Sequence, residues 1–217
     1  MTQVEPSTYS RTVLDIPNRD RRAERRSSTR TEILEAAWEL CAANGLASLS
    51  LRDLAQRIGL KAPSLYSYFD SKNAIYDAMF AQGCQQLLDE RPREIPDDLL
   101  GGIRAIMGYF VDFCVADPVR YQLLFQPTIP GFEPSADSYA ISQTAMRLTF
   151  DWFAGHGLDR PDVVDLFTAI GSGIAAQQNS NEPGGDRWTK LVDDAALMFV
   201  RHIQAGDVPT DKGRSQT

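Results

Sequence analysis

Residues 50–69 read SLRDLAQRIGLKAPSLYSYF, and the pattern of this stretch decides how the rest of the chain is interpreted. Ser50 is a favoured N-cap residue, and Asp53 follows three positions later in a pattern close to a capping box. Gly59 marks a tight turn, and Pro63 suits a helix start because proline needs no N–H partner in the first turn. The stretch therefore predicts two short helices joined by a turn, which are stable only when packed against neighbouring elements.

Longer helices are predicted on both sides of this pair. From Ser27 to Asn44, apolar residues recur at spacings of three and four, and Gly45 follows as a C-cap. A linking helix is predicted over 71–90, and the prolines at 92 and 96 end it. Because the sequence shows no alternating strand pattern and no internal repeat, we expect an all-α fold. Further helices are predicted over 98–116, 118–126, 136–155, 161–179 and 186–205.

Charge is distributed unevenly along the chain, whose 217 residues carry a net charge of −7. Residues 1–80 contain 11 Lys and Arg against 10 Asp and Glu, whereas the remainder has a net charge of −8. This distribution excludes a uniformly basic nucleic-acid-binding protein and favours DNA contact at one end only. Six arginines lie in residues 1–26, which are interpreted as a disordered tail, as a basic arm against DNA, or as both.

Cysteine usage and hydropathy indicate where the protein works. Three cysteines, at positions 41, 84 and 114, occur in apolar helical patterns without paired spacing. An odd count of this kind favours reduced thiols in a cytosol over a disulfide framework. We find no run of about 18 apolar residues and no signal-peptide pattern at the N-terminus. The chain is therefore expected to be a soluble cytoplasmic protein with no membrane partner.

Several short motifs occur in order within residues 29–89: ILEAA at 33–37, Gly45, SLRDLA at 50–55, Ile58-Gly59, SLYSYF at 64–69 and Ser71-Lys72. With these motifs, residues 29–89 resemble the DNA-binding domain of TetR-family transcriptional regulators. The rear half resembles the family only in its length and helical pattern, together with a PVRYQLLF stretch at 118–125 that is similar to one branch of TetR-like C-terminal domains.

This resemblance implies a homodimer that places paired helix-turn-helix units in successive major grooves of double-stranded DNA. The operator is then expected to be palindromic, with half-sites separated by about one helical turn or slightly more, roughly 34–36 Å. The expected organisation is a flexible basic arm (1–26), a three-helix helix-turn-helix DNA-binding domain (27–72), a C-terminal helical ligand-binding and dimerisation domain (73–206) and a flexible tail (207–217).

The expected DNA-binding residues lie around the second short helix. Ser64 and Tyr66 are on its outer face, where they reach base edges or phosphates, although Tyr66 also suits packing against the preceding helix. Arg52 is placed to contact DNA from the first helix of the pair, unless a nearby acid pairs with it. Tyr68 suits phosphate contact and core packing equally. The full expected set is Arg30, Thr31, Ser50, Arg52, Lys61, Ala62, Pro63, Ser64, Tyr66, Ser67, Tyr68 and Lys72.

Aromatic residues are concentrated in the middle helices of the rear half. They are interpreted either as core or as the lining of a pocket for a small apolar effector. Polar contacts to such an effector are expected from Arg104, Arg120, Gln122 or Gln143. The expected lining comprises Met107, Phe110, Phe113, Cys114, Tyr121, Phe125, Phe132, Trp152, Phe153 and Phe167.

The last two helices are the expected dimer interface. Small residues in the first permit close backbone approach, and larger apolar residues in the second supply contact area. Two such helices from each subunit would pack as a four-helix bundle. The expected interface residues are Ala169, Gly173, Ala176, Trp188, Leu191, Ala195, Met198, Phe199 and His202.

No enzymatic activity, cofactor or metal is expected. The stretch GSGIAA at 171–176 fits a dinucleotide fingerprint, but no strand–helix–strand alternation surrounds it. The two histidines, His156 and His202, are too far apart in sequence to indicate a metal site. The expected function is a ligand-responsive repressor. Two alternatives are a TetR-like activator and a small-molecule-sequestering protein whose front domain is vestigial.

Overall fold

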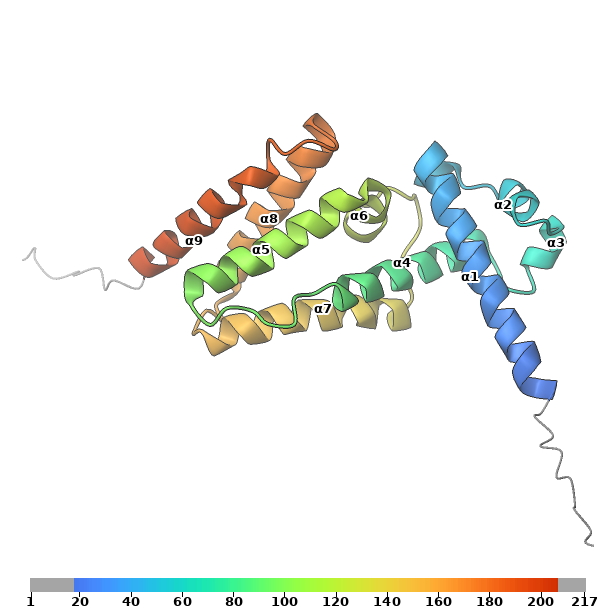
Figure 1. Ribbon diagram of the computed structural model, residues 1–217, viewed down its shortest axis with the longest axis horizontal. Coiled ribbons are helices and arrows are strands. Elements are labelled where there is room, and N and C mark those ends of the chain that lie inside the picture. Colours follow the sequence, from blue (N-terminus) through green and yellow to red (C-terminus); the bar gives the residue numbers. More distant parts are fainter. Residues whose placement is uncertain (1–17, 207–217) are drawn as a thin grey trace, which may run out of the picture.

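The computed structural model describes residues 18–206, and over that range the chain is helical and contains no strand (Figure 1). The front unit consists of α1 (Asn18–Asn44), α2 (Leu51–Arg57) and α3 (Ala62–Leu65). α4 (Lys72–Asp89) begins in this unit and continues into the rear half. Figure 1 shows the front unit at one end of the molecule and the last two helices at the other.

The short helices of the front unit begin and end where local chemistry predicts. The Ser50 hydroxyl caps α2 by accepting a hydrogen bond from the Asp53 N–H at 3.3 Å. Gly59 has a φ of 69°, which lets the chain turn sharply without the steric penalty that a side chain would cause. Pro63 lies in the first turn of α3. Ser71 caps α4 through the Ala74 N–H at 3.0 Å.

The front core holds these short helices in place. Ile33 of α1, Leu54 of α2, Leu65 of α3 and Ile75 of α4 are at most 1% exposed and belong to one cluster. Leu123, from the rear half, is buried in the same cluster. A four-residue helix such as α3 has too few internal hydrogen bonds to persist alone, so this packing is what fixes its orientation.

α1 begins nine residues earlier than predicted. Residues 18–26 were expected to be part of a flexible arm, but they form the first turns of α1. No proline or glycine interrupts residues 18–44, so the helix extends toward the N-terminus. The remainder of the expected arm, 1–17, and the expected tail, 207–217, lie outside the described residues.

α5 is the central helix of the rear half and packs against α6, α8 and α9. Contrary to the expectation that no such segment occurs, it is long and apolar enough to span a membrane, with a mean hydropathy of 1.6. Ile103, Met107 and Val111 are completely buried by the surrounding helices, which accounts for its apolar character. The rear helices are α5 (Leu99–Ala116), α6 (Pro118–Phe125), α7 (Ala136–Gly155), α8 (Pro161–Asn181) and α9 (Val192–Gly206).

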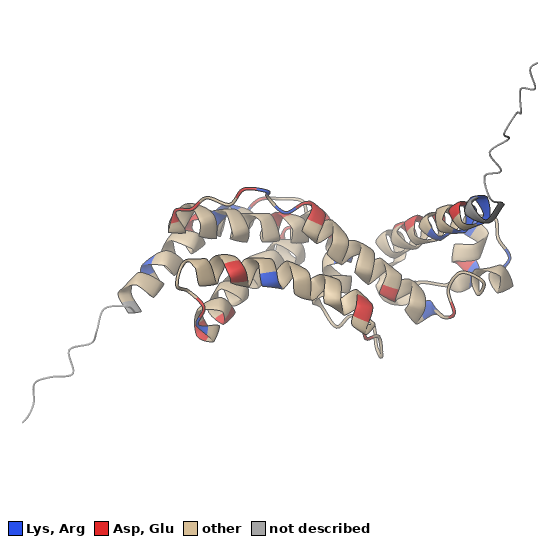
Figure 2. Ribbon diagram, turned by 90° about the horizontal axis from the view of Figure 1, so that it is seen from below, with Lys and Arg blue, Asp and Glu red and all other residues tan. Residues whose placement is uncertain are grey.

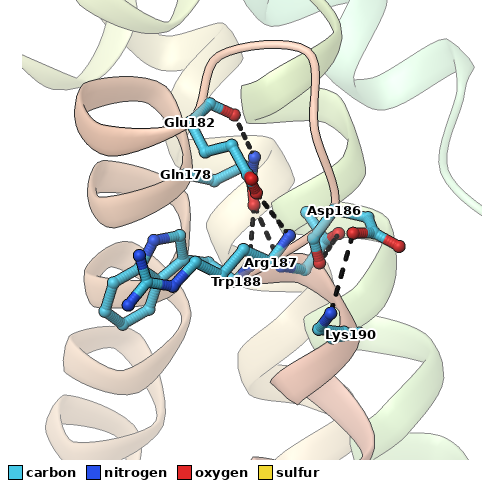
Figure 3. Close-up of polar contacts among 7 residues, drawn as sticks. Gln178, Glu182, Asp186, Arg187, Trp188 and Lys190 are labelled. Atoms are coloured by element: carbon cyan, nitrogen blue, oxygen red, sulfur yellow. Dashed lines mark hydrogen bonds and ion pairs between the residues drawn. The ribbon is translucent and has the colours of Figure 1, made fainter.

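The connection between α8 and α9 is held by Gln178, a polar side chain that is 1% exposed (Figure 3). Its amide donates to the Glu182 carbonyl, and its oxygen accepts from the Trp188 N–H at 2.8 Å and the Thr189 N–H at 3.3 Å. The chain therefore turns through a 3-10 segment at Thr189–Leu191 before α9 begins. This turn explains why α9 starts six residues later than predicted.

Cys41, Cys84 and Cys114 are buried and free. Burial disfavours the charged thiolate and raises the pKa of Cys41 to about 11 and that of Cys84 and Cys114 to about 12. All three thiols are therefore protonated and unreactive at neutral pH.

Candidate DNA-binding surface and ligand cavity

One face of α3 is buried in the front core, and the opposite face is exposed to solvent. Leu65 is 1% exposed and Phe69 is 4% exposed, so both anchor this segment in the front core. Ser64 faces solvent, and Tyr66 is 54% exposed, so about half of its side chain is accessible to a binding partner. Lys61, Pro63 and Ser67 are also exposed. A polar and aromatic surface of this kind suits hydrogen bonding to base edges and phosphates.

Two further expected residues flank this surface. Arg52, in the first turn of α2, is exposed, and no acid of the described residues lies within 4.0 Å of it. Thr31 is exposed on α1, and its hydroxyl donates to the Ser27 carbonyl at 3.3 Å. Ser50 is half-buried and serves as the α2 cap. Arg52 and Lys61 are thus the cations of the expected set for which the described residues provide no hydrogen-bond or ion-pair partner.

Arg30 has an internal role that sequence reasoning missed. Its Nη1 donates to the Tyr68 carbonyl, and its guanidinium lies 4.1 Å from the centre of the Phe69 ring. Arg26, one turn earlier on α1, donates from Nη2 to the Ser67 carbonyl at 2.8 Å. The two arginines therefore tie α1 to the turn that follows α3. These contacts give Arg30 a structural role, while its expected contact with DNA stays a prediction.

Other members of the expected set are also engaged in the fold. Lys72 donates from Nζ to the Ala47 carbonyl at 3.3 Å, and its ammonium lies 5.4 Å from the Tyr76 ring centre. Ala62 and Tyr68 are half-buried and pack against the front core, so core packing is the observed environment of Tyr68. These contacts exist without DNA and define the shape of the surface.

Basic and acidic positions are scattered along the helices, and both kinds occur on α1 (Figure 2). Several arginines follow one another on the first turns of α1, at positions 21, 22, 25 and 26. Arg57 of α2 is paired with Glu39 of α1 at 2.5 Å on the surface. The positive charge available to DNA phosphates is therefore concentrated on α1 and near α3.

A cavity of about 280 Å³ lies between α4, α5, α6, α7 and α8. Four of the residues expected to line a pocket do so: Met107, Phe110, Phe125 and Phe167. Gly171 of α8 also lines it, and a Cβ there would lie 3.3 Å from the Phe110 ring. The GSGIAA stretch at 171–176 lies within α8.

The cavity opens to solvent along α7. Tyr139 is 51% exposed, Met146 is 55% exposed and Phe150 is 41% exposed, and all three line the cavity. Phe125 of α6 is 41% exposed and completes this rim. Large apolar residues that remain exposed around a concave site are typical of a ligand entrance.

The other residues expected in the pocket lie elsewhere. Phe113, Cys114 and Tyr121 are buried in a small cluster with Ala175 between α5, α6 and α8. Phe153 is buried in the rear core and Trp152 packs against that core, while Phe132 contacts Tyr76 of α4 at a centroid distance of 5.7 Å. Whether an aromatic side chain fills a core or lines a cavity depends on the helix opposite it, which periodicity does not reveal.

Among the expected polar contacts, Gln143 lines the cavity and the others do not. Arg104 pairs with Asp193 on the surface at 2.6 Å, and Arg120 is buried, with its guanidinium 4.0 Å from the centre of the Phe113 ring. Sequence reasoning missed several polar lining residues because they are spread over α4, α5, α7 and α8. They are Arg91, Tyr109, Tyr139, Ser142, Thr149 and Thr168.

The expected dimer interface is divided between surface and core. Ala195 and Phe199 are 8% and 1% exposed within one chain. They therefore belong to the rear core, which corrects their expected place in the interface. Trp188 is half-buried and packs against the same core, and Ala176 is also half-buried. The exposed members of the expected set are Ala169, Gly173, Leu191, Met198 and His202.

The fold and these surfaces define a helix-turn-helix DNA-binding protein with a second, helical domain that contains a cavity. Residues 33–79 match the family model described as bacterial regulatory proteins, tetR family. This match covers the helix-turn-helix unit and identifies it as a DNA-binding domain of the TetR type.

Relatives extend the similarity beyond the front unit. The HTH-type transcriptional regulator Rv1816 of Mycobacterium tuberculosis is 26% identical over 220 aligned residues, which cover 89% of each chain. The HTH-type transcriptional repressor KstR2 of Rhodococcus jostii is 36% identical over 87 residues, which cover 40% of this chain and 37% of that protein. A crystal structure of a TetR-family transcriptional regulator from Streptomyces coelicolor has the same fold, with a TM-score of 0.61, 19% identity and coverage of 84% of this chain and 82% of that one.

Proposed function

We propose that this protein is a cytoplasmic, ligand-responsive repressor that binds a palindromic operator as a homodimer and is released by a small apolar effector. The observation that carries this proposal is the position of α4. Ile75, Tyr76 and Met79, in its first half, are completely buried in the front core. Cys84 and Leu87, in its second half, line the cavity. One helix therefore belongs to both the DNA-binding unit and the ligand site.

This shared helix supplies a physical route from ligand to DNA. Phe80 is 6% exposed, belongs to the front core and also lines the cavity, so the two sites share a side chain. A ligand that binds one position of α4 better than another shifts the population toward that position. Because α3 is held against α4 and α1, the distance between the two recognition segments of a dimer then changes. The operator binds the dimer better when α4 is in one of its two positions. A ligand that prefers the other position of α4 therefore reduces the affinity for the operator.

The homodimer is supported by the exposed face of α8 and α9. Met198 of α9 is 59% exposed, and Leu191, in the 3-10 segment that precedes α9, is 39% exposed. Leu166 of α8 is 37% exposed and adds to the same helices. Isolated apolar residues on a surface are ordinary, but small and apolar residues on two adjacent helices suit an isologous four-helix contact.

A binding experiment with DNA that flanks the protein's own coding region tests the proposal. Fluorescence anisotropy is expected to show sequence-specific, salt-sensitive binding to a palindromic site, and a reporter assay is expected to show repression. Absence of specific binding would favour a sequestering protein with a vestigial front domain, and activation of the reporter would favour an activator.

The dimer is tested by Met198→Glu, which places a charge on the exposed face of α9. Analytical ultracentrifugation is expected to show dissociation of the dimer. Operator binding is expected to be at least tenfold weaker, which corresponds to a loss of about 1.4 kcal/mol in the binding free energy. Leu148→Glu is the matched control because the Leu148 side chain is 40% exposed on α7 and does not line the cavity. A variant at Met198 that stays dimeric would contradict the proposed interface.

A further inference from the structure

The cavity lining has a single charged side chain among the described residues. Most of the lining is apolar, and its polar members are hydroxyl, phenol and amide groups, with one exception. That exception is Arg91, which follows the last turn of α4; its backbone N–H donates to the Leu88 carbonyl at 3.3 Å. An apolar cavity with one cation has a defined electrostatic preference, because a low-dielectric surrounding strengthens charge interactions.

Arg91 has unused hydrogen-bonding capacity. Its Nη1 donates to the Thr149 hydroxyl at 3.1 Å, and its Nη2 donates to the Leu148 carbonyl at 3.3 Å. A guanidinium has five N–H donors, and neither of these two partners is charged. No carboxylate of the described residues lies within 4.0 Å of it. Burial disfavours the charged form and lowers the pKa of Arg91, yet the group remains protonated at neutral pH.

We infer that the effector of this protein is an anionic amphiphile, an apolar molecule with one carboxylate that pairs with Arg91. This inference rests on the proposed function, in which the cavity receives an effector. A carboxylate accepts two hydrogen bonds from a guanidinium in a planar arrangement, which makes arginine the side chain best suited to it. The pairing also supplies the counter-charge that the half-buried cation lacks in the protein alone.

The size of the cavity limits the apolar part. An apolar cavity of about 150 Å³ holds benzene, so a cavity of about 280 Å³ holds on the order of 10–12 non-hydrogen atoms. A medium-length fatty acid or an aryl-alkyl carboxylic acid meets this limit. The apolar body then lies among Phe110, Phe125 and Phe167, with the carboxylate toward the end of α4.

The position of Arg91 connects this recognition to regulation. Arg91 extends from the end of α4 and bonds to Thr149 and Leu148 of α7, so it ties the two helices together. A carboxylate that pairs with the remaining N–H donors of this guanidinium draws it away from these two oxygen acceptors. Binding of the effector therefore weakens the hydrogen bonds that connect the end of α4 to α7. The other end of α4 lies in the DNA-binding unit.

Isothermal titration calorimetry with octanoate, 1-octanol and octylamine tests the inference on the full chain. These probes share an alkyl chain and differ in head-group charge. Octanoate is expected to bind at least about tenfold more tightly than 1-octanol, and octylamine is expected to bind most weakly. Arg91→Gln should abolish the preference for octanoate while leaving 1-octanol binding unchanged, and Arg91→Lys should retain part of it. Arg104→Gln, which removes a surface arginine, is the matched control and should leave the preference intact.

Three results would overturn the inference: no octanoate binding at millimolar concentration, 1-octanol binding as tightly as octanoate, or an unchanged preference in Arg91→Gln. Thermal melts monitored by circular dichroism establish that each variant is folded. Operator release is measured separately by anisotropy. If octanoate binds through Arg91 and the operator stays bound, ligand-induced release fails while the assignment of Arg91 holds. If octanoate releases the operator equally well from the wild-type protein and from Arg91→Gln, the assignment of Arg91 fails while the repressor function holds.

Discussion

Replacing Arg30 with alanine distinguishes between two roles of this side chain: a bracing role, in which it stabilises the front unit, and contact with a DNA phosphate. Arg30 donates to the Tyr68 carbonyl and stacks on Phe69, so it holds the turn that follows α3 against α1. If this is its role, Arg30→Ala destabilises the front unit and weakens DNA binding by loosening the recognition segment. If Arg30 instead contacts DNA phosphate, the same substitution leaves the free protein nearly as stable as before.

The contacts set the expected size of the effect. A hydrogen bond from a charged donor contributes about 1.5–3 kcal/mol, and a cation over an aromatic ring contributes about 0.5–2 kcal/mol. Since Arg30 is half-buried and the two contributions are not additive, we expect a loss of roughly 1.5–3 kcal/mol in the free energy of unfolding. For a chain of this length, each 1 kcal/mol lowers the melting temperature by about 2–4 °C, so the expected decrease is roughly 3–12 °C.

Two measurements on three variants complete the test: thermal melting, and operator affinity as a function of salt concentration. Arg30→Ala is expected to lower the melting temperature and the affinity without changing the slope of log affinity against log salt. Arg30→Lys keeps the charge but loses the planar stacking, so it should restore little stability. Arg52→Ala, at an exposed arginine, should change stability by less than about 0.5 kcal/mol and lower the salt slope by about 1.

The bracing role would be refuted by a different pattern. An Arg30→Ala protein with wild-type melting temperature and a salt slope lowered by about 0.9 would behave as one that has lost a phosphate contact. Full recovery of affinity in Arg30→Lys would point to the same conclusion, because a lysine can supply charge but not the planar contact with Phe69.

Two further predictions concern the rear half. A Cβ on Gly102 would lie 1.9 Å from the Trp152 ring, so Gly102→Ala should destabilise the fold by about 1–3 kcal/mol in chemical denaturation. On the same helix, a Cβ on Gly108 would make only an ordinary contact with the Val192 side chain at 3.8 Å, so Gly108→Ala should be neutral or stabilising. Equal effects of the two substitutions would contradict the packing. His156 lies within hydrogen-bond distance of the Trp152 and Asp97 carbonyls, at 2.8 and 2.9 Å, and these acceptors raise its pKa. Its contribution to stability is therefore complete below the unfolded-state pKa of about 6.5 and is lost as pH rises through the folded-state pKa. His156→Gln should accordingly lower the melting temperature at pH 5.5 more than at pH 8.5, and an equal decrease at both pH values would show that the imidazolium is not the stabilising form.

Local signals explain which parts of the fold were predictable. Ser50 and Ser71 cap their helices through N–H groups three residues away, and Pro118 and Pro161 lie in the first turns of α6 and α8. Gly59 adopts the positive φ that its turn requires. Each of these features depends on residues within about one turn of helix, so the amino-acid order alone carries it.

The candidate site was predictable only in part. Ser64 and Tyr66 were expected on the outer face of α3, and the burial of Leu65 explains why they are there. Arg30 was expected to face DNA because an arginine near a recognition segment is usually a phosphate contact. Its actual partners, the Tyr68 carbonyl and the Phe69 ring, are 38 and 39 positions away in the sequence, and no local pattern indicates such a pairing.

By itself, the sequence determined that this protein is helical, where most helices begin and end, and that residues 50–69 form a helix-turn-helix. The tertiary structure alone decided which aromatic residues line a cavity, that Arg91 is the charged side chain facing it, and that α4 belongs to both sites. Helix capping and turn formation depend on groups a few residues apart, whereas burial and cavity shape depend on helices brought together from distant parts of the chain.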